Sequence, residues 1–147
     1  MGKTYKPRYH SKRVLVSKEF TFDAAHNLIG YEGACERLHG HTYKLIIGIS
    51  GVPDDNLGMV IDFKELKRLY QMYIEPVVDH QYLNETLPEM NTTAENMVVW
   101  LFNKFQGIIC IATIDEIRVV GRPRVEFIKL YETPTSYAVA TREWMEE

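Results

Sequence analysis

Two stretches of alternating apolar and polar residues, 14–26 and 38–50, constrain the fold of this chain most strongly. In the first, apolar side chains recur at every second position from Val14 onward, with Lys18 as an interruption. A period of two is typical of a β-strand with one buried face. The second stretch carries a longer apolar run, and a glycine-bearing connection separates the two. We therefore predict an antiparallel strand pair.

Three of the five histidines lie where these two strands are predicted to meet: His26, His39 and His41. His39 and His41 are two residues apart, so on a strand both point to the same face. Three imidazoles leave one tetrahedral position open, as in catalytic zinc sites. The pattern predicts a metal site, with Zn²⁺ as the preferred ion; the ligand set alone also fits iron, nickel or copper.

A first helix is predicted to begin after Asp62, a good N-cap, with Glu65 completing a capping-box pattern. Pro76 is expected to end or kink this helix. Its apolar face is formed by residues at helical spacing. These residues are Phe63, Leu66, Leu69, Tyr70 and Tyr73.

A second helix is predicted to begin at Thr92 or Thr93, where a capping-box pattern starts, and to end at Gly107. Two further strands are predicted over 114–120 and 125–131. The order ββααββ indicates an α+β fold, with one four-stranded antiparallel sheet and both helices on one face. The unpaired edges of such a sheet favour assembly by edge pairing.

Length and composition indicate one globular domain. The chain has 147 residues, of which 46% are hydrophobic and 25% charged, and its net charge of −3 argues against a nucleic-acid partner. Basic residues gather near the start, and we interpret 1–13 as a flexible N-terminal arm before a single domain over 14–147. No apolar run is long enough to span a membrane or to form a secretory signal, and the two cysteines favour no disulfide, so a cytoplasmic location is expected.

Four residues besides the three predicted metal ligands are candidates for chemistry: Cys35, Asp79, His80 and Glu132. Cys35 stands in the polar connection, and three interpretations stay open: a buried small residue, a fourth zinc ligand, or a thiol of lowered pKa that acts as base or nucleophile. The adjacent Asp79 and His80 follow the first helix, where a carboxylate can orient an imidazole for proton transfer. Glu132 ends a core-facing row, and if buried it needs a partner such as a ligand with two parallel N–H donors. Cys110, within an apolar run, is interpreted as a core residue.

Several of these residues belong to motifs that occur together in one order. The motifs are His26, Cys35-x-x-x-His39-Gly40-His41, Gly58-Met59-Val60-x-Asp62-Phe63, Asp79-His80-x-x-Leu83-Asn84, Thr93-x-Glu95-Asn96 and Glu132-Thr133-Pro134. In this order, over about 14–140, the chain resembles the 6-pyruvoyl-tetrahydropterin synthase family. Within that family it is most similar to the bacterial 6-carboxy-5,6,7,8-tetrahydropterin synthases of queuosine biosynthesis.

The resemblance implies the tunnelling fold, in which subunits pair strand edges into a barrel and two barrels stack as a homohexamer, a dimer of trimers. It also implies active sites between subunits. The implied site residues are Cys35, Asp79 and His80 for catalysis, Glu132, Thr92 and Thr93 for pterin binding, and His26, His39 and His41 for Zn²⁺.

The implied reaction converts 7,8-dihydroneopterin triphosphate into 6-carboxy-5,6,7,8-tetrahydropterin, with loss of triphosphate and acetaldehyde. The partners expected are therefore this small molecule and further copies of the chain, without nucleic acid or membrane. Two alternatives remain: a synthase that forms the pyruvoyl product of the biopterin pathway, and a non-catalytic zinc-binding module with Cys35 as fourth ligand. The triphosphate contacts are not identified, although Arg37 and Lys44 are candidates by position.

Overall fold

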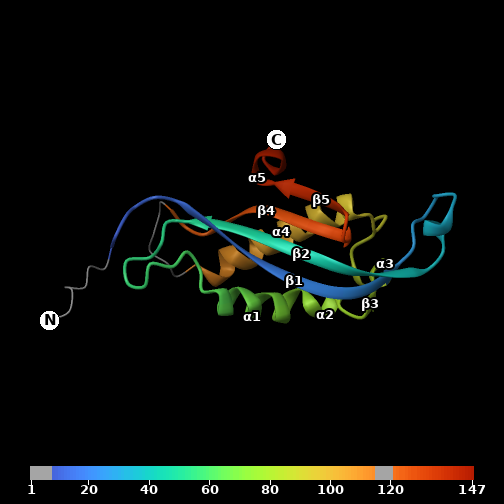
Figure 1. Ribbon diagram of the computed structural model, residues 1–147, viewed down its shortest axis with the longest axis horizontal. Helices are drawn as coiled ribbons and strands as arrows, with labels where there is room; N and C mark the ends of the chain where they lie inside the picture. The colour runs from blue at the N-terminus through green and yellow to red at the C-terminus, as the bar shows by residue number, and fades with distance from the viewer. Residues whose placement is uncertain (1–7, 115–120) are drawn as a thin grey trace.

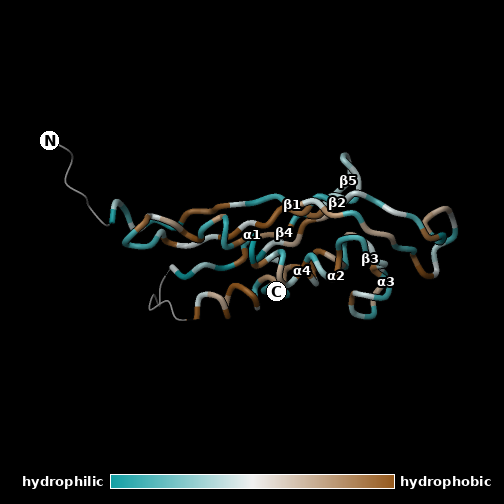
Figure 2. The backbone as a smooth tube through the Cα atoms, turned by 90° about the horizontal axis from the view of Figure 1, so that it is seen from below, coloured by the Kyte–Doolittle hydropathy of each residue, from teal (hydrophilic) through white to brown (hydrophobic). Residues whose placement is uncertain are grey.

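The computed structural model describes residues 8–114 and 121–147, and its core is a five-stranded sheet with helices packed on one face (Figure 1). The strands are β1 (Val14–His26), β2 (His39–Gly51), β3 (Gln81–Tyr82), β4 (Arg124–Thr133) and β5 (Ser136–Thr141), in the spatial order β3-β1-β2-β4-β5. The helices are α1 (Phe63–Tyr73), α2 (Glu75–Val78), α3 (Leu83–Thr86), α4 (Ala94–Ala112) and α5 (Arg142–Met145). The sheet forms one layer and the helices another (Figure 2), which confirms the α+β prediction.

The β1–β2 pair lies in the interior of the sheet, and the alternating pattern predicted it. The two strands pair antiparallel over their full lengths, from Val14 opposite Gly51 to His26 opposite His39. Along β1, Phe20, Phe22, Ala24 and His26 are all buried. His26 therefore shares the core-facing row of Phe22, as expected.

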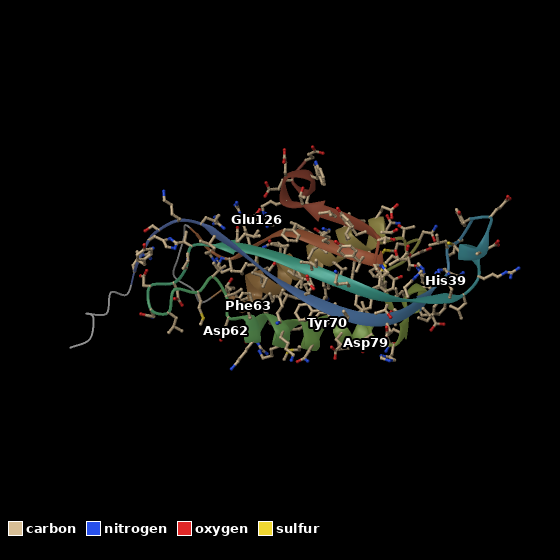
Figure 3. The ribbon with its side chains drawn as sticks, in the orientation of Figure 1. His39, Asp62, Phe63, Tyr70, Asp79 and Glu126 are labelled. Carbon is tan, nitrogen blue, oxygen red and sulfur yellow. The ribbon has the colours of Figure 1, made fainter. Side chains whose placement is uncertain are left out.

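Helix α1 begins as predicted, because the Asp62 carboxylate accepts a hydrogen bond from the Lys64 N–H at 2.8 Å. Glu65 does not complete a capping box; its carboxylate instead pairs with Arg68. The buried face is narrower than predicted, since Phe63 and Tyr73 at its two ends are about half exposed. Tyr70, between them, lies against the sheet in Figure 3 and stacks on Phe20.

The chain turns from α1 into the short α2 close to Pro76, which confirms that the proline ends the first helix. Pro76 occupies the first turn of α2, where a missing N–H costs no hydrogen bond. The turn leads to β3, which pairs with β1 in parallel at Ala24 and Ala25. A two-residue strand of this kind has no periodicity that a sequence pattern can reveal.

Helix α4 differs from its prediction at both ends. Its N-cap is Thr93, whose hydroxyl accepts from the Asn96 N–H at 3.2 Å, so the Thr92 capping box does not form. The helix also continues through Gly107 to Ala112, because burial of Ile109 on the helix face outweighs the low propensity of one glycine. Cys110 lies on the opposite side and is exposed, so its assignment to the core was wrong.

The C-terminal part of the sheet contains a strand that the sequence analysis missed. The strand predicted over 125–131 is confirmed as the body of β4, and a tight turn at Pro134 returns the chain into β5. The predicted strand over 114–120 lies outside the described residues, apart from Ile114. In the sheet as described, β5 takes one edge and β3 the other, and these two strands bring the three confirmed strands to five. Because β3 pairs in parallel, the prediction of a four-stranded, wholly antiparallel sheet was wrong.

The predicted boundary between an arm and a domain stays a prediction. Within the described end of that arm, Arg8 pairs with Asp55, and Arg13 donates a hydrogen bond to Ser50 Oγ at 2.8 Å. Across residues 8–114 and 121–147, none of the helices combines the length and apolar character needed to cross a bilayer.

Replacement of Gly48 by alanine is expected to destabilise the protein. Gly48 pairs with Phe127 where the β2–β4 register shifts, and a Cβ at this position would overlap the Phe127 ring. We expect a loss of about 1–3 kcal/mol in the free energy of unfolding, measured by denaturant titration. Gly107→Ala is the matched control, because a Cβ there meets nothing and an alanine in α4 should add about 0.5–1 kcal/mol. A Gly48→Ala protein as stable as the parent would contradict this packing.

Candidate metal centre and active site

The structure brings the three predicted histidines together at one end of the sheet. His26 closes β1, while His39 and His41 open β2, and one nitrogen of each lies within 4.8 Å of the others. Figure 3 shows His39 at this end, far from Glu126 at the other. His26 is almost fully buried, whereas His39 and His41 are partly exposed. The cluster is therefore enclosed at His26 and accessible from outside at His39 and His41.

Backbone carbonyls fix the tautomers of two of these rings. His26 Nδ1 lies 2.8 Å from the Thr92 carbonyl oxygen, and His39 Nδ1 lies 2.7 Å from the Arg37 carbonyl oxygen. A carbonyl only accepts, so each Nδ1 carries the proton and donates it. In the neutral rings each Nε2 is then left with a lone pair, the form in which imidazole binds metals.

The two Nε2 atoms of His26 and His39 are 3.1 Å apart. Neither neutral ring has a proton there to donate, and burial lowers the pKa of His26, which keeps that ring neutral. A shared cation would satisfy both lone pairs. Two nitrogens bound to one tetrahedral Zn²⁺ at 2.0–2.1 Å stand about 3.3 Å apart, close to the observed separation. The donor set and its spacing thus fit a metal ion.

Glu132 lies beside this cluster. Its Oε1 is 3.4 Å from His26 Nε2 and 3.6 Å from His41 Nε2, and its side chain is about one third exposed. Burial lowers the pKa of His41, and the Glu132 carboxylate opposes this shift. Glu132 therefore adds negative charge where a cation would sit, while its exposed part is accessible to a ligand.

Two asparagines that were not predicted as site residues, Asn84 and Asn91, hold the chain after His26. Asn84 accepts from the Asn27 N–H at 3.1 Å and donates to the Asn27 carbonyl at 2.9 Å. Asn91 makes the same pair of bonds with Ile29, at 2.9 and 3.0 Å. Each side-chain amide thus makes with the backbone the donor and acceptor pair that a residue of a neighbouring strand would make. The signal available in the sequence was the position of Asn84 within the Asp79-His80 motif.

The adjacent Asp79 and His80 do face each other, as a proton relay requires. His80 Nδ1 lies 3.0 Å from Asp79 Oδ2, and His80 has φ of 56°, an uncommon value for a residue other than glycine. Asp23 holds the turn from both sides: its N–H donates to Asp79 Oδ1 at 3.1 Å and its carbonyl accepts from the His80 N–H at 2.6 Å. Such a conformation persists only where the surroundings enforce it, and it gathers at functional sites.

The pair also borders the region of the histidine cluster. His80 is well exposed and lines a cavity of about 580 Å³ together with His41. Hydrogen bonding to Asp79 raises the pKa of His80. Burial acts to raise the pKa of Asp79, but hydrogen bonds from the Asp23 N–H and from His80 outweigh it, so the net shift is downward.

Replacing Asp79 with asparagine is expected to move the titration of His80 to lower pH. The carboxylate holds His80 in its charged form, so the stabilising effect is present below the ordinary histidine pKa and is lost as pH rises through the raised value. The measurement is a pH titration of the His80 ring signals by NMR. Asp55→Asn, in the loop between β2 and α1, is the control and should leave the His80 signals unchanged. An equal pKa for His80 in the parent and Asp79→Asn would contradict the pairing.

Three predicted site residues remain: Cys35, Thr92 and Thr93. Cys35 lies half-buried in a single 3₁₀ turn (Ala34–Glu36), tied back by a hydrogen bond from the Leu28 N–H to its carbonyl at 2.8 Å. Its sulfur is not part of the cluster of ligand atoms. Thr92 is buried and supports His26, and Thr93 caps α4, so their predicted contacts with a pterin stay predictions.

Comparison with known proteins agrees with this geometry. Residues 15–143 match the family described as 6-pyruvoyl tetrahydropterin synthase. The chain is 36% identical over 133 residues to the 6-carboxy-5,6,7,8-tetrahydropterin synthase of Haemophilus influenzae, covering 83% of this chain and 94% of the relative. The corresponding Synechocystis protein is 34% identical, with 84% and 90% covered.

Solved structures show the same fold at lower identity. The Caenorhabditis elegans 6-pyruvoyl tetrahydropterin synthase superposes with a TM-score of 0.74 at 21% identity, over 91% of this chain and 99% of that one. The Plasmodium falciparum synthase gives a TM-score of 0.66 at 21% identity, over 89% and 98%. The described chain thus has the α+β subunit fold of these proteins, with its sheet open rather than closed. With the family match and the identity to the bacterial enzymes, the chain belongs to the 6-pyruvoyl tetrahydropterin synthase family.

Proposed function

We propose that this protein is a metal-dependent pterin lyase. It converts 7,8-dihydroneopterin triphosphate and water into 6-carboxy-5,6,7,8-tetrahydropterin, acetaldehyde and triphosphate, as a step of queuosine biosynthesis. The observation that carries this proposal is the 36% identity to a bacterial enzyme of that name. The three-histidine cluster, with its deprotonated Nε2 atoms, supports it independently.

Zn²⁺ is the proposed ion, held by His26, His39 and His41, because a three-imidazole site with an open fourth position suits catalytic zinc. When bound, it would act as a Lewis acid toward the hydroxyl groups of the substrate side chain. The cluster's accessible side, at His39 and His41, supports an approach of substrate from that direction. Burial of His26 and its bond to Thr92 would keep the ligand frame fixed.

The protein groups proposed for catalysis surround this frame. Cys35, as a thiolate, would take and return protons on the side-chain carbons, and the imidazole of His80 would serve as a second acid and base with Asp79 orienting it. Glu132 would hold the amino-pyrimidine edge of the pterin, whose two parallel N–H groups match a carboxylate. Backbone groups near Thr92 and Thr93 would assist it.

We further propose that the protein works as a cytoplasmic homohexamer with active sites shared between subunits. Among the described residues, the outer edge of β1 is paired only at Ala24 and Ala25, and β5 forms the other edge of the sheet. Open edges of this kind support pairing between copies of the chain. The cavity at His80 opens beside the β1 edge, which supports a contribution of this residue to a neighbouring site.

The test is incubation of the purified, metal-loaded protein with 7,8-dihydroneopterin triphosphate, with every product identified. We expect stoichiometric 6-carboxytetrahydropterin, acetaldehyde and triphosphate. Triphosphate and a pyruvoyl pterin without acetaldehyde would show instead the activity named for the related protein of Pongo abelii, 6-pyruvoyl tetrahydrobiopterin synthase, which is 26% identical. An unchanged substrate with full metal occupancy would favour a non-catalytic metal-binding module.

A further inference from the structure

Two lysines and two tyrosines gather on the face of the sheet that points away from the helices. Lys44 on β2 lies opposite Tyr131 on β4, which in turn lies opposite Tyr137 on β5. Lys129 precedes Tyr131 by two residues and therefore shares its face. We call these four residues the lysine–tyrosine cluster. Their neighbours Leu45 and Leu130 are fully buried on the opposite face.

Both ammonium groups lie over tyrosine rings. Lys44 Nζ is 4.3 Å from the Tyr131 ring centroid, and Lys129 Nζ is 4.0 Å from that of Tyr137 and 5.1 Å from that of Tyr131. The two rings are 4.8 Å apart. Such stacking orients the lysines over the tyrosine rings. The two positive charges are thus held on one small patch.

The charges of these two lysines are not neutralised by ion pairs. Within residues 8–114 and 121–147, neither Lys44 nor Lys129 forms an ion pair with a carboxylate. Contact with Tyr131 raises the pKa of Lys129, so this group stays charged at neutral pH. Two adjacent lysines without an ion pair place positive charge on one patch of a protein whose net charge is −3, and such a patch suits an anionic ligand.

One cavity joins this cluster to the candidate active site. The β2–β4 pairing ends at Lys44 and Tyr131, and a cavity of about 450 Å³ lies beyond, lined by both residues together with His41 and Glu132.

We propose that the lysine–tyrosine cluster binds the triphosphate of the pterin substrate while Glu132 and the histidines hold its other parts. Lysine binds phosphate as a point charge, and the tyrosine hydroxyls offer further donors. The cluster adjoins the cavity that contains Glu132 and His41, so an anion bound there can belong to the same molecule as the pterin. This inference rests on the proposed function, since it takes that substrate as the ligand.

The test compares Lys44→Met and Lys129→Met with the parent protein. Each loss of a charge-assisted contact should lower kcat/KM for 7,8-dihydroneopterin triphosphate about tenfold, mainly through KM, and the double variant should lose more. Inhibition by dihydroneopterin without phosphate should be unchanged, because that compound makes no contact with the cluster. Lys67→Met, an exposed lysine on α1, is the matched control. Thermal unfolding and metal content verify that each variant is intact.

Two results would overturn the inference. The first is an unchanged kcat/KM in the double variant, or a loss of kcat/KM that appears only in Arg37→Met, which would place the triphosphate at the other candidate residue. The second is an equal loss of affinity for the phosphorylated and unphosphorylated compounds, which would place the lysines at the pterin. If the parent does not turn over the substrate at all, the proposed function fails separately. Calorimetric titration of the same proteins with inorganic triphosphate, with metal content checked afterwards, then decides whether the lysines bind the anion.

Discussion

Replacing His26 with alanine is expected to abolish stoichiometric metal binding and, with it, turnover. His26 contributes one of three converging nitrogens, so its removal leaves only those of His39 and His41. His39 Nε2 also loses the His26 Nε2 that lies 3.1 Å from it. Mutation of groups that merely support a metal ligand typically weakens metal affinity about 10–100-fold, so loss of a ligand should cost more. The measurement is metal content by elemental analysis after dialysis, together with the rate of product formation.

Because His26 is buried, its alanine variant also leaves a void in the protein. His39→Ala removes a more accessible ligand and provides a second test in which misfolding is a smaller concern. His10→Ala, outside the cluster, should retain a full equivalent of metal. A His26→Ala or His39→Ala protein that keeps one equivalent of metal would refute the three-histidine site.

Replacing Cys35 with alanine is expected to reduce turnover by about 10²–10⁴-fold while metal content stays unchanged. The expectation follows from a proton-transfer role in which the thiol does not ligate the ion, in agreement with the position of its sulfur outside the histidine cluster. Steady-state rates and metal analysis on the same preparations measure the two quantities. Cys110→Ala is the matched control, since that thiol lies exposed on α4.

The same variant separates the enzyme from the alternative of a metal-binding module. Loss of metal together with Cys35 would identify the thiol as a fourth ligand. Protection of Cys35 from alkylation only in the metal-loaded protein would support the same conclusion. Retained metal with retained turnover would instead remove Cys35 from the catalytic groups.

The strand pair and the histidine cluster could be predicted because both depend on strict alternation. A period of two ties His26 to the buried row of Phe22, and the glycine between His39 and His41 does not disturb it. Convergence of three side chains then follows from the antiparallel pairing alone. No long-range information was needed beyond the assumption that the two strands are neighbours.

The elements that were missed depend on contacts that a local pattern does not contain. β5 follows a tight turn at Pro134 without the asparagine or glycine that usually marks a two-residue hairpin, and its small residues give weak alternation. Gly107 suggests a helix end, yet packing of Ile109 carries α4 past it. Thr92 matches a capping pattern, but its carbonyl and hydroxyl are directed to His26 instead.

The site beyond the histidines was only partly accessible to sequence reasoning. Asp79 and His80 were recognisable as a pair, but the left-handed backbone at His80 that turns them toward each other depends on Asp23, more than fifty residues earlier. Glu132 was expected to contact a ligand, and in the structure its carboxylate lies beside His26 and His41. Of the two asparagine contacts, only that of Asn84 had a signal in the sequence, its place in the Asp79-His80 motif, and that motif did not reveal its partner Asn27.

Those asparagine contacts have a consequence for how the protein acquires its ion. Asn84 and Asn91 hold the segment after His26 in place through their side chains, and carbonyl oxygens of the protein fix the rings of His26 and His39. The entropic cost of ordering the ligands is therefore met during folding rather than at metal capture. The intrinsic affinity for imidazole is greater for copper than for zinc, so selection of Zn²⁺ depends on the geometry that the fixed ligands impose and on which metal is available.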